Sequence, residues 1–132
     1  MSFGSLLRAS LLATVTATAF VGCRTVNLDP SGDLQAVYQM GEFRMLVNNT
    51  APATAQAAEA ALRTMDLYQT KKQTSQYEAS FEARARNDKR VRVWIAEQNR
   101  NQTLVRIRWG EAGDLNLSRS LFAQIERGLP SR

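Results

Sequence analysis

The chain has 132 residues, of which 17 are Lys or Arg, 12 are Asp or Glu, one is Cys and none is His, so its formal charge is +5. This length fits one domain with a short leader, and the apolar content of 44% excludes a disordered chain. Without His and with a single Cys, the chain lacks an intrachain disulfide, the usual zinc, copper and haem ligand sets, and a Ser–His or Cys–His nucleophile. No pair of carboxylates has a spacing that suggests acid–base catalysis. We therefore expect a protein that is not an enzyme and that carries no metal or cofactor.

The N-terminal segment predicts an export signal that ends at Cys23. A single Arg lies among the first eight residues, and residues 9–22 are uncharged and largely apolar. This run is shorter than the roughly 20 residues of a membrane-spanning helix. The segment Ala19-Phe20-Val21-Gly22-Cys23 resembles the lipobox of bacterial lipoproteins, although Phe20 stands where leucine is usual. The resemblance implies that residues 1–22 are a signal peptide and that Cys23 is acylated, as by palmitate. The alternative is an ordinary secreted protein with a free Cys23 thiol.

Residues 23–36 are predicted to be the lipidated cysteine and a flexible tether, because Asp29–Asp33 is rich in turn-forming residues. Arg24 follows the cysteine in place of the aspartate that retains lipoproteins in the inner membrane of enterobacteria. By the same resemblance, we expect the protein in the cell envelope, on the periplasmic face of the outer membrane.

Residues 37–130 are expected to form a single domain that begins with a strand and a helix. The alternation of side chains in Tyr38–Val47 predicts the first strand. The alanine-rich segment from about Pro52 predicts a helix with one apolar stripe. After this helix, the residues from Leu67 favour a short strand, and Lys71-Lys72 favours a solvated turn.

The clearest periodic signal lies between residues 77 and 109. Apolar and polar side chains alternate there with a period of two over three segments. The turn-forming runs Asn87–Lys89 and Asn99–Asn101 separate the segments. The pattern predicts an antiparallel meander of three strands.

A second amphipathic helix is expected from about Leu115 to Arg127, with Asp114 as its N-cap. Each predicted helix has a single apolar stripe that needs an apolar surface to cover it. The inward side chains of the strands supply this surface. The sequence therefore predicts an α+β fold in which two helices pack on one face of a mostly antiparallel sheet, made of the first strand and the meander.

The outward side of the predicted meander collects positive charge around one tryptophan. Its residues are Arg84, Arg86, Arg92, Trp94, Arg106 and Arg108. Guanidinium groups bind phosphate and carboxylate, and tryptophan anchors at lipid interfaces. These residues are therefore a candidate surface for an anionic ligand or a partner. The alternative is a solvated sheet face on which acidic side chains of neighbouring strands pair with the arginines.

A block of strand, Gly, Gly-Asp, Ser and helix gives a family resemblance. Leu104–Gly110, Gly113-Asp114, Ser118 and Ile125 resemble small bacterial lipoproteins of an uncharacterised family, the domain of unknown function 3568. Gly41, Ala57–Leu62 and Leu67 fit the same outline, whereas Trp109 and Leu115 depart from it. The resemblance implies the lipoprotein class and the α+β fold, and it brings no catalytic residue.

These features favour a non-enzymatic envelope lipoprotein, a binding or interaction module held at the membrane by its N-terminal lipid. The expected partners are an anionic envelope lipid, a glycan or another envelope protein. A soluble periplasmic ligand-binding domain without the anchor is one alternative, which would use the sheet face or a cavity under the first helix. A nucleic-acid-binding module is a second alternative, although no nucleic acid is expected as the partner of an exported chain.

Overall fold

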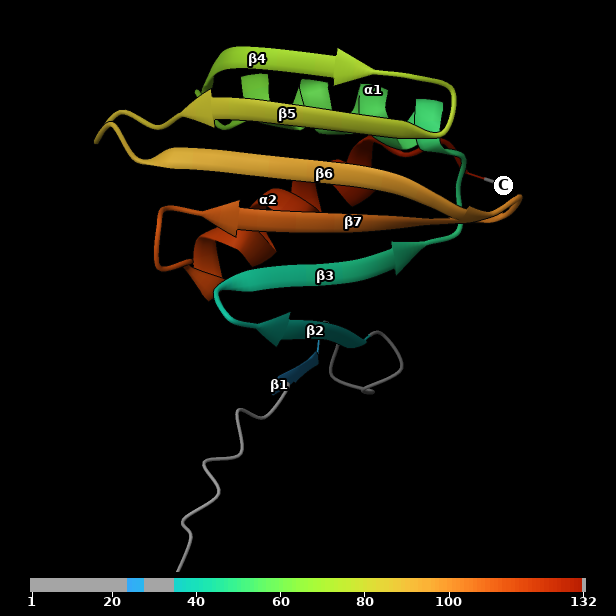
Figure 1. Cartoon of the computed structure of the whole chain (residues 1–132), viewed down its shortest axis with the longest axis horizontal. Helices are drawn as coiled ribbons and strands as arrows, with labels where there is room; N and C mark the ends of the chain where they lie inside the picture. The colour runs from blue at the N-terminus through green and yellow to red at the C-terminus, as the bar shows by residue number, and fades with distance from the viewer. Residues whose placement is uncertain (1–23, 28–34, 132) are drawn as a thin grey trace, which may run out of the picture.

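The computed structural model describes residues 24–27 and 35–131 (Figure 1). The predicted signal peptide, Cys23 and the turn-rich segment Asp29–Asp33 lie outside the described residues. The described elements are β1 (Arg24–Asn27), β2 (Gln35–Gln39), β3 (Glu42–Val47), α1 (Ala51–Thr64), β4 (Tyr68–Thr74), β5 (Glu78–Arg84), β6 (Arg90–Asn99), β7 (Gln102–Trp109) and α2 (Leu115–Gly128).

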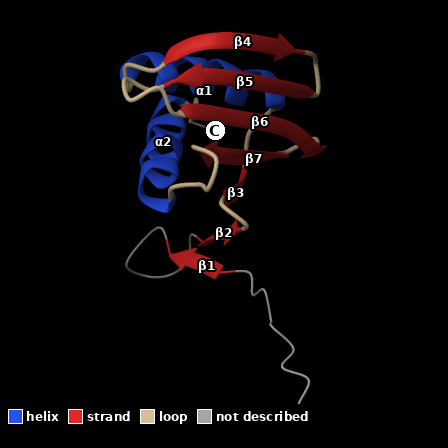
Figure 2. Ribbon diagram, turned by 60° about the vertical axis from the view of Figure 1, so that its left-hand side comes forward, coloured by secondary structure: helices blue, strands red, loops and turns tan. Residues whose placement is uncertain are grey.

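The strands form one seven-stranded antiparallel sheet in the order β1-β2-β3-β7-β6-β5-β4. Strands β4 to β7 form a meander, and the N-terminal strands join it because β3 pairs with β7. Both helices cover the same face: α1 lies behind β4 to β6, and α2 lies behind β7 and β3 (Figures 1 and 2). The predicted α+β class with two helices on one face is confirmed. The strand order differs from the prediction, since the first predicted strand lies beside the last strand of the meander.

The first predicted strand, Tyr38–Val47, is in fact the hairpin of β2 and β3. Met40 and Gly41 connect the two strands, and both have a positive φ, 51° and 79°. Two successive residues with positive φ form a turn whose twist matches that of the flanking strands. The prediction of one continuous strand was wrong because Met-Gly lacks the Asn or Asp that usually marks such a turn.

Strand β1 lies where the sequence predicted a flexible tether. Arg24 pairs with Tyr38 of β2, and Asn27 pairs with Gln35. The pairing gives hydrogen-bond partners to backbone groups along the outer edge of β2, which would otherwise be exposed. A strand of four residues is too short to show a periodic signal, so the sequence could not indicate it.

Strand β4 forms the opposite edge of the sheet. The expected strand after the first helix is confirmed, but Lys71 and Lys72 lie within it and not in a turn. A bulge between Gln69 and Lys71 directs Lys72 toward the helices, where its Nζ lies 2.8 Å from Glu59 Oε2. Lysines and bulges are common on edge strands because they hinder pairing with other chains.

The core lies between the sheet and the two helices. The alternation predicted for the meander is confirmed within β5, β6 and β7, where the inward side chains are buried: Ala79, Phe81, Ala83, Val91, Val93, Ile95, Val105, Ile107 and Trp109. Tyr77, the first residue of the predicted pattern, precedes β5 and is exposed. The buried rings of Phe43 on β3 and Phe122 on α2 lie 5.5 Å apart. Burial of each ring contributes roughly 1.5–3 kcal/mol, so this pair helps to hold α2 against the sheet. The buried face of α1 is mostly alanine, which allows close approach to the strands.

The β2–β3 turn is docked against the loop that joins β7 to α2, and we call the contact between Met40-Gly41 and Gly110–Asp114 the glycine junction. A Cβ atom added to Gly113 would lie 2.3 Å from the carbonyl oxygen of Gly41, so no side chain fits there. The Arg108 guanidinium donates hydrogen bonds to the carbonyl oxygens of Met40, at 2.6 Å, and Glu111, at 2.7 Å. Arg108 therefore ties the turn and the loop together.

The last residue of the glycine junction, Asp114, is also the N-cap of α2. The carboxylate of Asp114 accepts a hydrogen bond from the backbone N–H of Leu117 at 2.9 Å, which confirms the predicted N-cap. Further along the capped helix, the side chains of Leu121, Phe122 and Ile125 are buried in the core.

Candidate binding face of the sheet

Within the described residues, one face of the sheet has no helix over it, and we call it the open face. Its side chains include Val37 and Gln39 from β2, Glu42, Arg44 and Leu46 from β3, Leu104, Arg106 and Arg108 from β7, Arg90, Arg92, Trp94 and Ala96 from β6, Glu78, Ser80, Glu82 and Arg84 from β5, and Tyr68, Lys71 and Gln73 from β4. Lys and Arg outnumber Glu on this face, so it carries a net positive charge.

Trp94 and Arg106 lie at the centre of the open face. They are paired across β6 and β7, and the guanidinium carbon of Arg106 lies 5.1 Å from the centroid of the Trp94 ring. A cation–π contact of this kind contributes about 0.5–1 kcal/mol at an exposed site. The contact keeps the charged group of Arg106 over the ring, so that a bound molecule would meet both at once.

Glu42 neutralises only part of this charge. Its carboxylate lies 2.6 Å from Nε of Arg44 and 3.7 Å from a terminal nitrogen of Arg106. One carboxylate thus serves two guanidinium groups. Because both arginines keep about two fifths of their side-chain surface exposed, 45% and 36%, they remain accessible to a second anion.

Arg92 extends the positive charge along β6. In the sheet register, Arg92 lies opposite Glu82 on β5 and opposite Arg108 on β7. The Glu82 carboxylate lies 3.5 Å from Nε of Arg90. Among the described residues, the Arg92 side chain has no ion pair or hydrogen bond, and it therefore offers an unused set of donors on the open face.

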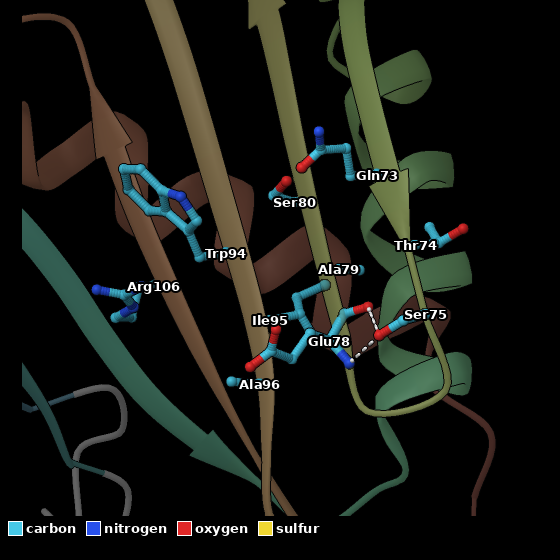
Figure 3. A pocket seen from close by; sticks show the side chains of 10 residues that line it. All are labelled: Gln73, Thr74, Ser75, Glu78, Ala79, Ser80, Trp94, Ile95, Ala96 and Arg106. Atoms are coloured by element: carbon cyan, nitrogen blue, oxygen red, sulfur yellow. Dashed lines mark hydrogen bonds between the residues drawn. The ribbon is translucent and has the colours of Figure 1, made fainter.

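Two hollows lie on either side of this arrangement. The larger, about 440 Å³, has Trp94 and Arg106 on one side and Gln73, Ser75 and Glu78 on the other (Figure 3). The smaller, about 140 Å³, is lined by Lys71 and Arg92 among others. Trp94, Gln73 and Ser80 line both hollows. The face thus combines an aromatic ring, hydrogen-bonding side chains and cations within one concave area.

Three arginines of the predicted surface, Arg84, Arg86 and Arg108, contact other groups of the protein through their guanidinium groups. Arg108 lies on the open face, but its guanidinium holds the glycine junction. Arg84 also lies on this face, and its guanidinium donates to the carbonyl oxygen of Asp88 at 3.0 Å. Arg86 was predicted within the strand, but β5 ends at Arg84. Its guanidinium lies 3.4 Å from the carboxylate of Asp66, after α1, so Arg86 is separate from the other five residues.

The open face also contains residues that the predicted surface did not include. Arg44 joins the face because β3 pairs with β7, a contact between segments about 60 residues apart in sequence. Gln73 and Lys71 join it because β4 is a complete strand. Ser80 lies on the outward side of the predicted alternation, and this alternation was the one sequence signal that could have placed it on the face.

The described residues contain neither a metal-ligand group nor a membrane-spanning helix. No group of three or more Cys, Asp or Glu residues in residues 24–27 and 35–131 lies close enough together to hold a metal ion. Neither α1 nor α2, the helices of these ranges, is long and apolar enough to cross a membrane.

Comparison with known proteins gives a family. Residues 6–128 match the family described as "Protein of unknown function (DUF3568)". The matched region includes most of the predicted signal peptide and Cys23, and it ends at the last residue of α2. No curated protein matches the chain.

Proposed function

We propose that this chain, which belongs to the DUF3568 family, is a non-enzymatic envelope lipoprotein that binds an anionic partner on the open face of its sheet. The protein would be anchored through Cys23 on the periplasmic face of the outer membrane. The partner would be an envelope lipid, a glycan or another envelope protein that presents phosphate or carboxylate groups.

The observation that carries this proposal is the arrangement of Trp94, Arg106 and Arg92. The ring is held beside one guanidinium group, and the neighbouring arginine has no partner among the described residues. Guanidinium groups form paired hydrogen bonds with phosphate and carboxylate, and tryptophan gives a flat apolar surface against a sugar ring or an acyl chain. This combination recognises an anion attached to an apolar or ring-shaped body.

The N-terminal sequence supports the anchor. The lipobox-like segment ends at Cys23, and the match to the family begins at residue 6, so that the leader belongs to the matched region. Stable anchoring by acyl chains needs more than one chain. Lipoprotein processing provides this at an N-terminal cysteine and needs no catalytic group from the protein itself.

Metabolic labelling with radioactive palmitate tests the anchor. The wild-type protein should be labelled and should sediment with membranes, and a Cys23→Ala variant should not be labelled. Equal labelling of the two proteins would contradict the anchor. Release of the wild-type protein in osmotic-shock fluid would instead favour a soluble periplasmic domain.

Site-specific photocrosslinking in living cells tests the open face. A photoreactive amino acid at Gln73 lies at the rim of both hollows, and one at the exposed Gln56 on α1 is the matched control on the covered side of the sheet. We expect a defined product from Gln73 only, and its mass will separate a protein partner from a lipid or glycan. The same product from both positions would contradict a role for the open face.

A further inference from the structure

We propose that the end of the sheet containing the glycine junction rests on the membrane surface, with Met40 as its lipid contact. The inference depends on the proposed acylation of Cys23 and goes beyond it. It states how the domain is oriented and which side chain touches the bilayer.

The pairing of β1 brings the anchor to this end of the sheet. Cys23 directly precedes Arg24, and Arg24 pairs with Tyr38, two residues before Met40. From residue spacing within strands and between them, the backbones of Arg24 and Met40 are on the order of 10 Å apart. A tether of residues 23–36 would have let the domain move about 45 Å from the membrane. With β1 in the sheet, this freedom is lost.

The Met40 side chain is suited to contact the membrane interface. Its side chain is apolar and 75% exposed, and its backbone has a φ of 51°. Asn, Asp or Gly would occupy this turn position with less strain and without exposing apolar surface. The turn is also fixed in place, because Arg108 binds the Met40 carbonyl oxygen and Gly41 is packed on Gly113. An apolar side chain is thus held outward, next to the predicted anchor.

The opposite end of the sheet contains the β6–β7 turn and the residues between β3 and α1. Its turns carry amides that bind one another: Asn99 Nδ2 donates to Gln102 Oε1 at 3.1 Å, and Gln102 Nε2 donates to Asn48 Oδ1 at 3.4 Å. Amides are costly to remove from water, so this end suits the aqueous side. The strands then stand end-on to the membrane. The open face points sideways into the aqueous space, where a partner can reach its hollows.

Fluorescence quenching in vesicles tests this orientation. The only native cysteine, Cys23, is blocked by acylation, so an environment-sensitive fluorophore can be attached to Met40→Cys in protein purified from bacterial membranes. Arg100→Cys, an exposed position in the β6–β7 turn, is the matched control. A second label at the exposed Ala112→Cys provides an independent position at the glycine junction.

In vesicles that contain lipids with nitroxide groups near the head group, we expect quenching at Met40→Cys and Ala112→Cys to be at least threefold stronger than at Arg100→Cys. Equal quenching at the three positions in vesicle-bound protein would overturn the orientation alone. Protein that is not acylated and does not float with the vesicles would overturn the anchor, and the orientation with it.

Discussion

Replacement of Gly113 by alanine should be among the most damaging small substitutions in the domain. Gly113 has a φ of 84°, and a Cβ atom in this region costs about 1–2 kcal/mol. The new Cβ would also lie 2.3 Å from the carbonyl oxygen of Gly41, so the docked turn must move, and such overpacking costs about 1–3 kcal/mol. Together these terms predict a loss of about 3 kcal/mol, a large part of the ~5–15 kcal/mol that stabilises a typical domain.

Gly110 provides the matched control. Its φ is 78°, almost the same as that of Gly113, but an added Cβ would meet only the Lys89 side chain, at 3.7 Å. Gly110→Ala should therefore lose only the backbone term, about 1–2 kcal/mol. Urea unfolding of the mature protein, followed by circular dichroism, measures both values. Equal losses in the two variants would show that the contact with Gly41 is not what makes Gly113 necessary.

Three further predictions can be checked by the same unfolding assay. Asp114→Ala removes the N-cap of α2 and should cost about 1 kcal/mol, whereas Asp114→Asn should stay close to the wild type; equal losses would refute the cap. Arg108→Ala breaks two bonds from a charged donor and should cost about 2 kcal/mol, whereas Arg92→Ala should change stability by less than about 0.5 kcal/mol; a similar loss in both would refute their separate roles. Thr103→Val removes the buried 2.8 Å hydrogen bond from Thr103 Oγ1 to the carbonyl oxygen of Asn49, and it should lower the free energy of unfolding by about 1–3 kcal/mol. An unchanged urea midpoint would contradict a stabilising role for this hydrogen bond.

The sequence was informative wherever one local rule decided the structure. The alternation in the meander predicted which side chains are buried, because a sheet with one covered face sorts its residues with a period of two. Asp114 was recognisable as a cap from its position before the amphipathic segment. The Met40-Gly41 turn was missed because its geometry is stabilised by tertiary contacts, chiefly the Arg108 hydrogen bond, and not by a typical turn residue. The pairing of β3 with β7 was missed because no local pattern encodes a contact between distant segments.

The candidate site was predictable in part for the same reason. Alternation placed Arg92, Trp94 and Arg106 on one side of the meander. It could not indicate that Arg108 is occupied by two backbone carbonyl groups, since both belong to loops whose approach depends on the whole fold. It also could not indicate that Arg86 lies beyond the end of its strand, because the alternation continues for two residues past Arg84.

The most direct test of the central claim is the yield of the Gln73 photocrosslink in charge variants. Arg92→Gln with Arg106→Gln removes the two cations that the proposal assigns to the anionic partner. Arg63→Gln with Arg127→Gln removes the same charge from exposed positions on the two helices. At matched protein levels, the open-face variant should lose the crosslinked product and the helix variant should keep it. A product that persists unchanged in the open-face variant would contradict the claim that this face binds an anionic partner.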